Sequence, residues 1–302
     1  MKLGLVTPGW TFEVMSKNIA MAGRLGYECL ELDDIDFFNI DGDGIKRILE
    51  VVEENNVSVA SVTACFSHLD PDPASKEAAN KATVRAIELA HKFGADTVMT
   101  LALADLTDTL EGNIKKYKET FSEYARAAEA NGVKLVIENW PRMTREPIRF
   151  GNLAFSPEMW DIMFNEVPSD AIGLEYDPSH LVWQGIDIPR TIKMFKDKIF
   201  AFHAKDTSID YDNLGLVGIM GKNVNSEFGG DWWTHRLPGL GDIKWHEVFR
   251  ALYDIGYDGP VFLEQEDSAF GMGSDRFEEG CKFAYNFLKP YILDMREFKN
   301  EK

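Results

Sequence analysis

Acidic and imidazole side chains follow four short apolar runs in the second half of the chain. Glu138 follows the run at 134–137, Asp177 the run at 172–175, His203 the run at 199–202, and Glu264 the run at 261–263. If these runs are parallel strands of one barrel, their carboxyl ends share the rim that carries the chemistry. Carboxylates with imidazole and no cysteine suit a divalent ion such as Mn²⁺, Mg²⁺, Co²⁺ or Zn²⁺. The four residues together predict a metal site.

Each of these residues also has an ordinary structural explanation. A lone carboxylate after a strand often caps a helix or lies on the surface, and Asp177 before Pro178 can open a turn. A lone histidine such as His203 is often a hydrogen-bonded structural residue. Because these explanations would have to hold at four neighbouring strand ends at once, the joint pattern favours the metal.

Apolar runs alternate with helical patterns along the whole chain. The expected strands are 3–7, 29–32, 58–64, 97–101, 134–137, 172–175, 199–202 and 261–263. The expected helices are 16–25, 44–55, 75–93, 114–130, one from 157, 188–195, 245–255, and one from about 276 to the end. Eight strand–helix units predict the α/β class: a (β/α)8 TIM barrel, with residues 1–302 in a single domain. The segment at about 207–243, after the seventh strand, is expected to be a long irregular loop.

Two doubly wound domains are the alternative architecture. The first strand ends in Pro8-Gly9-Trp10, which is not the glycine-rich turn that cradles a dinucleotide. We therefore favour the barrel and expect no nucleotide cofactor.

Composition excludes several kinds of partner. The net charge of −18 would repel a phosphate backbone, so no nucleic acid is expected. No apolar run approaches the roughly 20 residues that span a bilayer, so no membrane is expected. The start at residues 1–6 is typical of a strand and not of a signal peptide.

The three cysteines, Cys29, Cys65 and Cys281, are widely spaced and suit reduced thiols, which favours a cytoplasmic protein.

The motifs at these strand ends resemble those of the sugar phosphate isomerase/epimerase family of xylose-isomerase-like barrels. The resemblance covers essentially the whole chain and is strongest from residue 134 to 270. The motifs that carry it are Ile137-Glu138-Asn139, Asp177-Pro178-Ser179-His180, His203-Ala204-Lys205-Asp206, Gly259-Pro260-Val261-Phe262-Leu263-Glu264, and the stretch from Arg236 to Trp245. The resemblance implies a divalent ion, Mn²⁺ before the others, held by Glu138, Asp177, His203 and Glu264.

The resemblance also implies a reaction. As in related epimerases, Glu138 and Glu264 would be the catalytic pair: one removes the proton α to a sugar carbonyl and the other returns it. The ion would polarise the carbonyl and stabilise the enediolate. The expected substrate contacts are His180, Lys205, Arg236, Trp10, Trp140 and His68. His180 could equally orient Asp177, and Lys205 could pair with Asp206.

Three other functions use the same parts or the same fold. On a 3-oxo-glycoside, the same proton abstraction followed by elimination would give a lyase or deglycosidase, and the segment at 207–243 could accommodate a bulky aglycone. Apurinic-site endonucleases share the barrel, but with more histidines and a DNA-binding face. A non-catalytic sugar-binding protein would not need two carboxylates beside a metal.

The expected partner is a small carbohydrate, and a homo-oligomer is compatible with the sequence.

Overall fold

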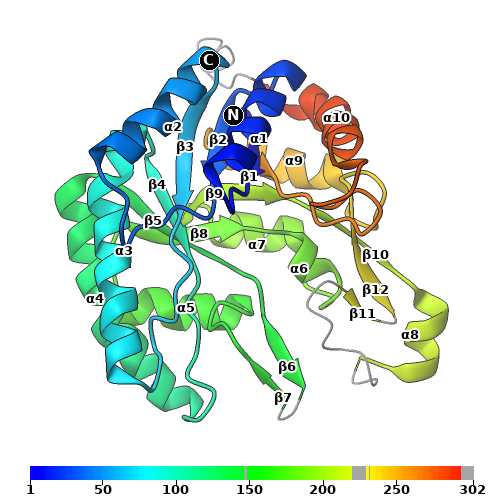
Figure 1. The fold of residues 1–302 in the computed structure, drawn as a ribbon. Helices are drawn as coiled ribbons and strands as arrows, with labels where there is room; N and C mark the ends of the chain where they lie inside the picture. The colour runs from blue at the N-terminus through cyan, green and yellow to red at the C-terminus, as the bar shows by residue number, and fades with distance from the viewer. Residues whose placement is uncertain (146–147, 220–228, 231, 294–302) are drawn as a thin grey trace, which may run out of the picture.

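The computed structural model describes residues 1–145, 148–219, 229–230 and 232–293. Its barrel strands are β1 (Lys2–Thr7), β2 (Cys29–Leu32), β3 (Ser58–Thr63), β4 (Thr97–Thr100), β5 (Lys134–Glu138), β8 (Ile172–Tyr176), β9 (Ile199–Ala204) and β13 (Pro260–Leu263). They are parallel and close in the order β1-β13-β9-β8-β5-β4-β3-β2 (Figure 1). The predicted TIM barrel is confirmed.

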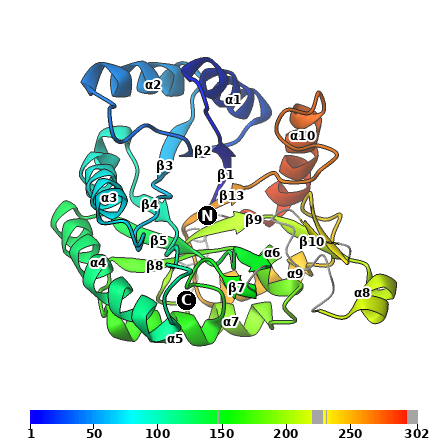
Figure 2. The same cartoon turned by 60° about the horizontal axis from the view of Figure 1, so that its bottom comes forward.

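Helices surround the barrel in a ring (Figure 2). They are α1 (Phe12–Leu25), α2 (Gly42–Glu54), α3 (Pro73–Phe93), α4 (Leu110–Asn131), α5 (Pro157–Glu166), α7 (Ile188–Met194), α9 (Trp245–Asp254) and α10 (Phe277–Leu288), with the short α6 (Ser179–Val182) and η1 (Lys289–Tyr291). In the described part of the chain, no helix has the length and apolar character needed to cross a membrane.

Helices α1 and α4 begin four residues earlier than expected, because a threonine upstream of each predicted start provides the cap. The Thr11 side chain accepts from the Val14 backbone N–H, whereas the Ser16 hydroxyl donates to the Phe12 carbonyl inside α1. Thr109 caps α4 in the same way, upstream of the expected start at 114. The last helix ends at Leu288, and residues 294–302 of its expected range lie outside the described residues.

The barrel interior changes from apolar to polar toward the carboxyl ends of the strands. An apolar layer contains Cys29, Met99, Val136, Ala201 and Phe262. Two residues further along the same strands stand Glu31, Glu138, His203 and Glu264. Because side chains two apart on a strand point to the same face, these polar groups also point inward, beyond the apolar layer.

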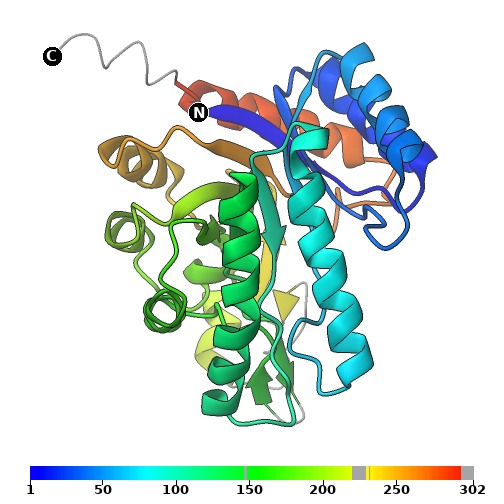
Figure 3. The ribbon, with the colours of Figure 1, turned by 90° about the vertical axis from the view of Figure 1, so that its left-hand side faces the viewer.

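Two hairpins extend from the end of the barrel opposite the N-terminus (Figures 1 and 3). One pairs β6 (Met143–Arg145) with β7 (Ile148–Phe150). The other is a small sheet of β10 (Asp206–Ile209), β12 (Trp233–Arg236) and β11 (Gly229–Gly230), with α8 (Tyr211–Val217) after β10. The segment expected to be irregular, 207–243, therefore contains strands and a helix, although 220–228 and 231 lie outside the described residues.

His68 lies between the barrel wall and helix α4, which corrects its expected place at the mouth. Its Nε2 is 2.7 Å from Thr100 Oγ1 and its Nδ1 is 3.0 Å from the Tyr124 hydroxyl. The ring also meets Phe121 edge-on and is fully buried. The loop after β3 turns outward, so this side chain fills the layer between barrel and helices.

Burial of His68 makes stability depend on pH. Burial lowers the pKa of His68 to about 3, so the folded protein keeps the ring neutral while the unfolded chain takes up a proton below about pH 6.5. This group therefore removes stability as the pH falls from about 6.5 toward about 3, by up to about 1.4 kcal/mol per pH unit. We expect His68→Gln to lose less stability than the wild type between about pH 6.5 and about pH 4.5.

Urea unfolding at several pH values, with a chelator present, measures this slope. His246→Gln changes an exposed histidine and should keep the wild-type slope. Equal slopes in His68→Gln and the wild type would contradict the prediction.

Candidate metal centre

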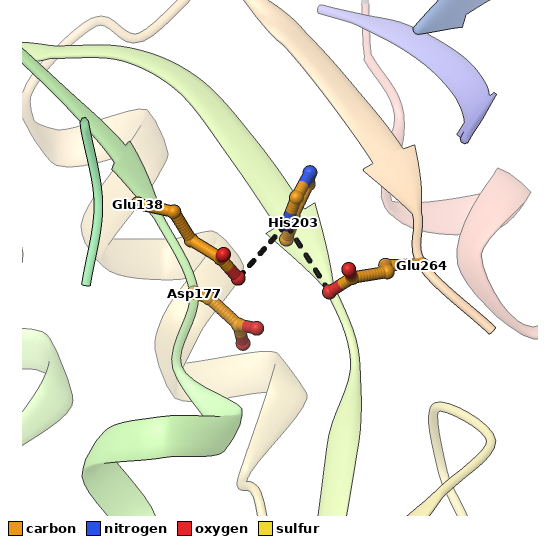
Figure 4. Close-up of side chains that lie close together, drawn as sticks. All are labelled: Glu138, Asp177, His203 and Glu264. Atoms are coloured by element: carbon orange, nitrogen blue, oxygen red, sulfur yellow. Dashed lines mark hydrogen bonds and ion pairs between the residues drawn. The ribbon is translucent and has the colours of Figure 1, made fainter. Parts of the chain in front are cut away.

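The structure brings together the four side chains that the sequence proposes as ligands (Figure 4). Glu138 ends β5, Asp177 directly follows β8, His203 lies in β9, and Glu264 directly follows β13. These four strands are consecutive in the barrel. One ligand atom from each residue lies within 4.8 Å of the others.

The spacing and the donor types fit a divalent ion. His203 Nδ1 is 3.4 Å from Glu138 Oε1 and 3.3 Å from Glu264 Oε2 (Figure 4). Ligand atoms that share one ion at bonds of about 2.1 Å are separated by about 3.0–3.5 Å. Asp177 Oδ2 is buried and has no hydrogen-bond partner within the described residues, while Oδ1 accepts from the Ser179 backbone N–H at 2.8 Å. An ion among the four would give this oxygen a ligand bond in addition to its ion pair with Lys205 Nζ at 3.1 Å.

Buried amide side chains fix the backbone at two of these positions. Asn139 accepts from the Asp177 N–H at 2.7 Å and donates to the Asp177 carbonyl at 2.8 Å. Asn152 donates to the Glu138 carbonyl at 2.9 Å. Asp177 lies just beyond its strand, where the sheet no longer holds the backbone. The two hydrogen bonds from Asn139 therefore help to keep its carboxylate in place.

Lys205 is the cation inside the cluster. Its Nζ is 3.1 Å from Asp177 Oδ2 and 2.8 Å from Glu266 Oε2, and it also donates to Glu264. Burial opposes the charge on Lys205, but the surrounding carboxylates raise its pKa well above the usual value. Burial, then Glu264, raise the pKa of Glu138, but the neighbouring His180, His203 and Lys205 bring it down to about 2. One ammonium among several ionised carboxylates leaves a negative excess that attracts a cation.

His180 lies beside the cluster, next to an aromatic wall. Its Nε2 is 3.3 Å from Asp177 Oδ2 and 3.5 Å from Glu138 Oε1. Its ring stacks on Trp140, with 6.5 Å between ring centroids. The position is compatible with a substrate contact and with orienting Asp177.

Two other expected contacts lie elsewhere. Arg236 Nε donates to Ser208 Oγ across the β10–β12 pair, at 3.1 Å. Trp10 is 66% exposed and lines a hollow of about 400 Å³ near the starts of α1 and α2. In the described part of the chain, neither Arg236 nor Trp10 has a recorded contact with any of the four candidate metal ligands.

His235 is a site residue that sequence reasoning does not find, since a histidine in a long loop is expected to be structural or exposed. Its ring meets that of His180 edge-on at 5.4 Å, and its Nε2 is 3.7 Å from Glu266 Oε2. The Thr207 hydroxyl donates to the Ser179 carbonyl and lies 3.1 Å from His235 Nδ1, so Nδ1 carries the ring hydrogen. Burial, then Lys205 and His180, lower the pKa of His235 well below the usual value. The neutral ring thus offers a bare Nε2, which is buried and has no hydrogen-bond partner in the described structure.

Glu31 and Glu175 are two further groups that sequence reasoning does not place at the site. Both are fully buried and approach His203 Nε2, at 3.0 Å and 3.2 Å. Burial, then Glu31, raise the pKa of Glu175 well above the usual value. Their signal in the sequence is a charged residue inside an otherwise apolar strand, which a soluble barrel rarely buries without a partner.

Comparison with known proteins agrees with the fold. The chain is 24% identical to the uncharacterized protein YfiH of Bacillus subtilis (strain 168), covering 97% of this chain and 99% of that one. D-allulose 3-epimerase from Methylomonas sp. superposes with a TM-score of 0.72 at 17% identity, over 97% of this chain and 98% of that one. The probable 3-DHS dehydratase AsbF from Bacillus anthracis superposes with a TM-score of 0.72 at 16% identity, over 96% and 99%.

The family assignment rests on a match to a family model. Residues 19–287 match the family described as the xylose isomerase-like TIM barrel. This stretch contains all four candidate ligands and most of the barrel. The chain therefore belongs to the family of xylose isomerase-like TIM barrels.

Proposed function

We propose that the protein is a divalent-metal-dependent sugar isomerase or epimerase that moves a proton at the carbon α to a carbonyl. The observation that carries the proposal is the placement of two glutamates. Glu138 and Glu264 approach the same nitrogen of His203 from β5 and β13, which β8 and β9 separate. Two carboxylates so arranged can flank one substrate carbon, and general acid–base catalysis needs one group on each side.

The remaining groups have roles that follow from their contacts. A divalent ion, Mn²⁺ before Mg²⁺, Co²⁺ or Zn²⁺, would supply Lewis-acid polarisation of the carbonyl when held by Glu138, Asp177, His203 and Glu264. Lys205 would donate to a substrate oxygen from among the carboxylates that now surround it. His180 and His235 would bind substrate hydroxyls, and Trp140 would provide an apolar wall.

A lyase is the second candidate, because it begins with the same proton abstraction. The likeness to a probable 3-DHS dehydratase supports it. So does the β10–β12 hairpin, where Trp233 stacks on Trp183 with 5.1 Å between ring centroids. Such a wall can hold a leaving group larger than a hydroxyl.

A product assay separates these functions. The Mn²⁺-loaded protein is incubated with ketoses, including D-fructose and D-allulose, and with 3-oxo-glycosides. A new sugar in chromatography supports the isomerase or epimerase, and a new elimination chromophore supports the lyase. Nicking of abasic duplex DNA with no sugar converted would overturn both.

We expect Glu138→Gln and Glu264→Gln each to reduce turnover by about 10²–10⁴-fold, because an amide cannot accept the substrate proton. Rates are measured at saturating Mn²⁺, so that weaker ion binding does not contribute, and circular dichroism checks the fold. Glu54→Gln, an exposed change on α2, is the matched control and should be fully active. Wild-type turnover in either site variant would contradict the proton-transfer role.

We expect Mn²⁺ to raise the thermal midpoint of the wild type, because an ion that binds only the folded state stabilises it. The gain is about 2.7 kcal/mol at an ion concentration about 100 times Kd. Asp177→Asn replaces a charged donor with a neutral one and should reduce the shift strongly. Calorimetry with and without a chelator measures it, and an equal shift in both proteins would exclude Asp177 from the site.

We expect His235→Phe to raise KM about fivefold while changing kcat less, since it removes one acceptor worth about 1 kcal/mol. His235→Gln retains an acceptor and should stay near the wild-type KM. Steady-state kinetics on the sugar found in the product assay gives both constants. Equal KM values for all three proteins would show that Nε2 does not meet the substrate.

A further inference from the structure

The imidazole of His203 has two buried carboxylates on the side away from the candidate metal centre. Nε2 is 3.0 Å from Glu31 Oε1, on β2, and 3.2 Å from Glu175 Oε1, on β8. All three side chains are 0% exposed. The ring therefore spans two layers of acid: Nδ1 faces Glu138 and Glu264, and Nε2 faces Glu31 and Glu175.

The contacts of these two carboxylates are incomplete. The Glu31 contact has hydrogen-bond geometry, and the ring N–H is the donor available to it. Glu31 Oε2 and both oxygens of Glu175 have no hydrogen-bond partner within the described residues. A buried carboxylate without full compensation costs several kcal/mol of folding free energy, and an apolar or amide side chain would avoid this cost. Stability therefore does not explain why the barrel holds two of them here.

We propose that Glu31, supported by Glu175, is a positioning residue for His203. By accepting the hydrogen on Nε2, Glu31 fixes the tautomer in which the Nδ1 lone pair faces Glu138 and Glu264. The nearby negative charge also makes Nδ1 a stronger donor to a cation. This inference rests on the proposed metal site and assigns residues that lie outside its four ligands.

The same three groups could instead hold a second cation, since one ligand atom from each lies within 4.8 Å of the others. The hydrogen bond favours positioning. If His203 gave both nitrogens to ions it would have to lose both ring hydrogens, whereas the Glu31 contact uses one of them. The number of ions bound per chain separates the two arrangements.

The experiment measures ion binding and not turnover. The probe is Mn²⁺, titrated calorimetrically into chelator-treated wild type, Glu31→Gln, Glu31→Asp and Glu175→Gln, with Glu54→Gln as the exposed control. We expect Glu31→Gln to weaken Mn²⁺ binding about 10–100-fold, as loss of a carboxylate behind a metal-bound histidine does elsewhere. Glu175→Gln should give a smaller loss in the same direction, and the control none.

The thermal stability of the ion-free proteins is the second measurement. The variants that lose Mn²⁺ affinity should not lose stability. Replacing the buried Glu31 carboxylate by an amide of equal size removes an uncompensated charge, so Glu31→Gln should melt at or above the wild-type temperature. Glu175, whose raised pKa favours the neutral form, should change the melting temperature less when replaced by glutamine. Glu31→Asp retains the charge but withdraws it from Nε2, so it should weaken Mn²⁺ binding without that gain. It also provides a test if Glu31→Gln fails to fold.

Three results would overturn the inference. Wild-type Mn²⁺ affinity in the folded Glu31 variants would show that the contact does not position the ring. Two tightly bound ions per wild-type chain would assign Glu31 and Glu175 to a second cation site. Failure of the wild type to bind Mn²⁺, Co²⁺ or Zn²⁺ would remove the proposed function as well, which distinguishes that failure from the first two.

Discussion

Uncompensated negative charge at one end of the barrel is the constraint on which the rest of the site depends. Inward-facing carboxylates lie in two layers: Glu31 and Glu175 below, and Glu138, Asp177, Glu264 and Glu266 above. Lys205 is the lysine that pairs with these carboxylates among the described residues. A fold selected for stability alone would replace such acids with neutral groups. Their presence supports the proposal that a positive ion completes the site.

Strand periodicity determines where these charges stand. Glu31, Glu138, His203 and Glu264 each lie two residues beyond an apolar side chain of the barrel interior, so the strands that fill the barrel also direct these polar groups inward. Two hydrogen bonds between the Asn139 side chain and the Asp177 backbone position a carboxylate that lies just beyond its strand. The hairpins then add what the barrel lacks, an aromatic and imidazole wall that includes Trp233 and His235. The opening step is common to an isomerase and a lyase, so this wall is where the two would differ.

The sequence is sufficient for the barrel and for the convergence of four side chains, because both depend on strand order and on the residue at each strand's carboxyl end. The sequence does not predict the positions of side chains that depend on the path of a loop or on pairing between distant segments. His68 also comes after a strand, but its loop turns outward. His235 returns to the mouth because 206–209 pairs with 233–236, a contact between distant residues. Glu31 and Glu175 are visible as charges in apolar runs, but their meeting at His203 depends on how far strands shift as the barrel closes.

Solvent-deuterium exchange tests the central claim most directly, because it reports the broken C–H bond whatever the product is. The wild-type protein, loaded with Mn²⁺, is incubated in deuterated water with ketoses and 3-oxo-glycosides, and the recovered sugars are analysed by mass spectrometry and NMR. The proposed proton transfer predicts deuterium at the carbon beside the carbonyl in at least one sugar, and none after chelation. A protein that binds Mn²⁺ but introduces no deuterium into any of these sugars would contradict it.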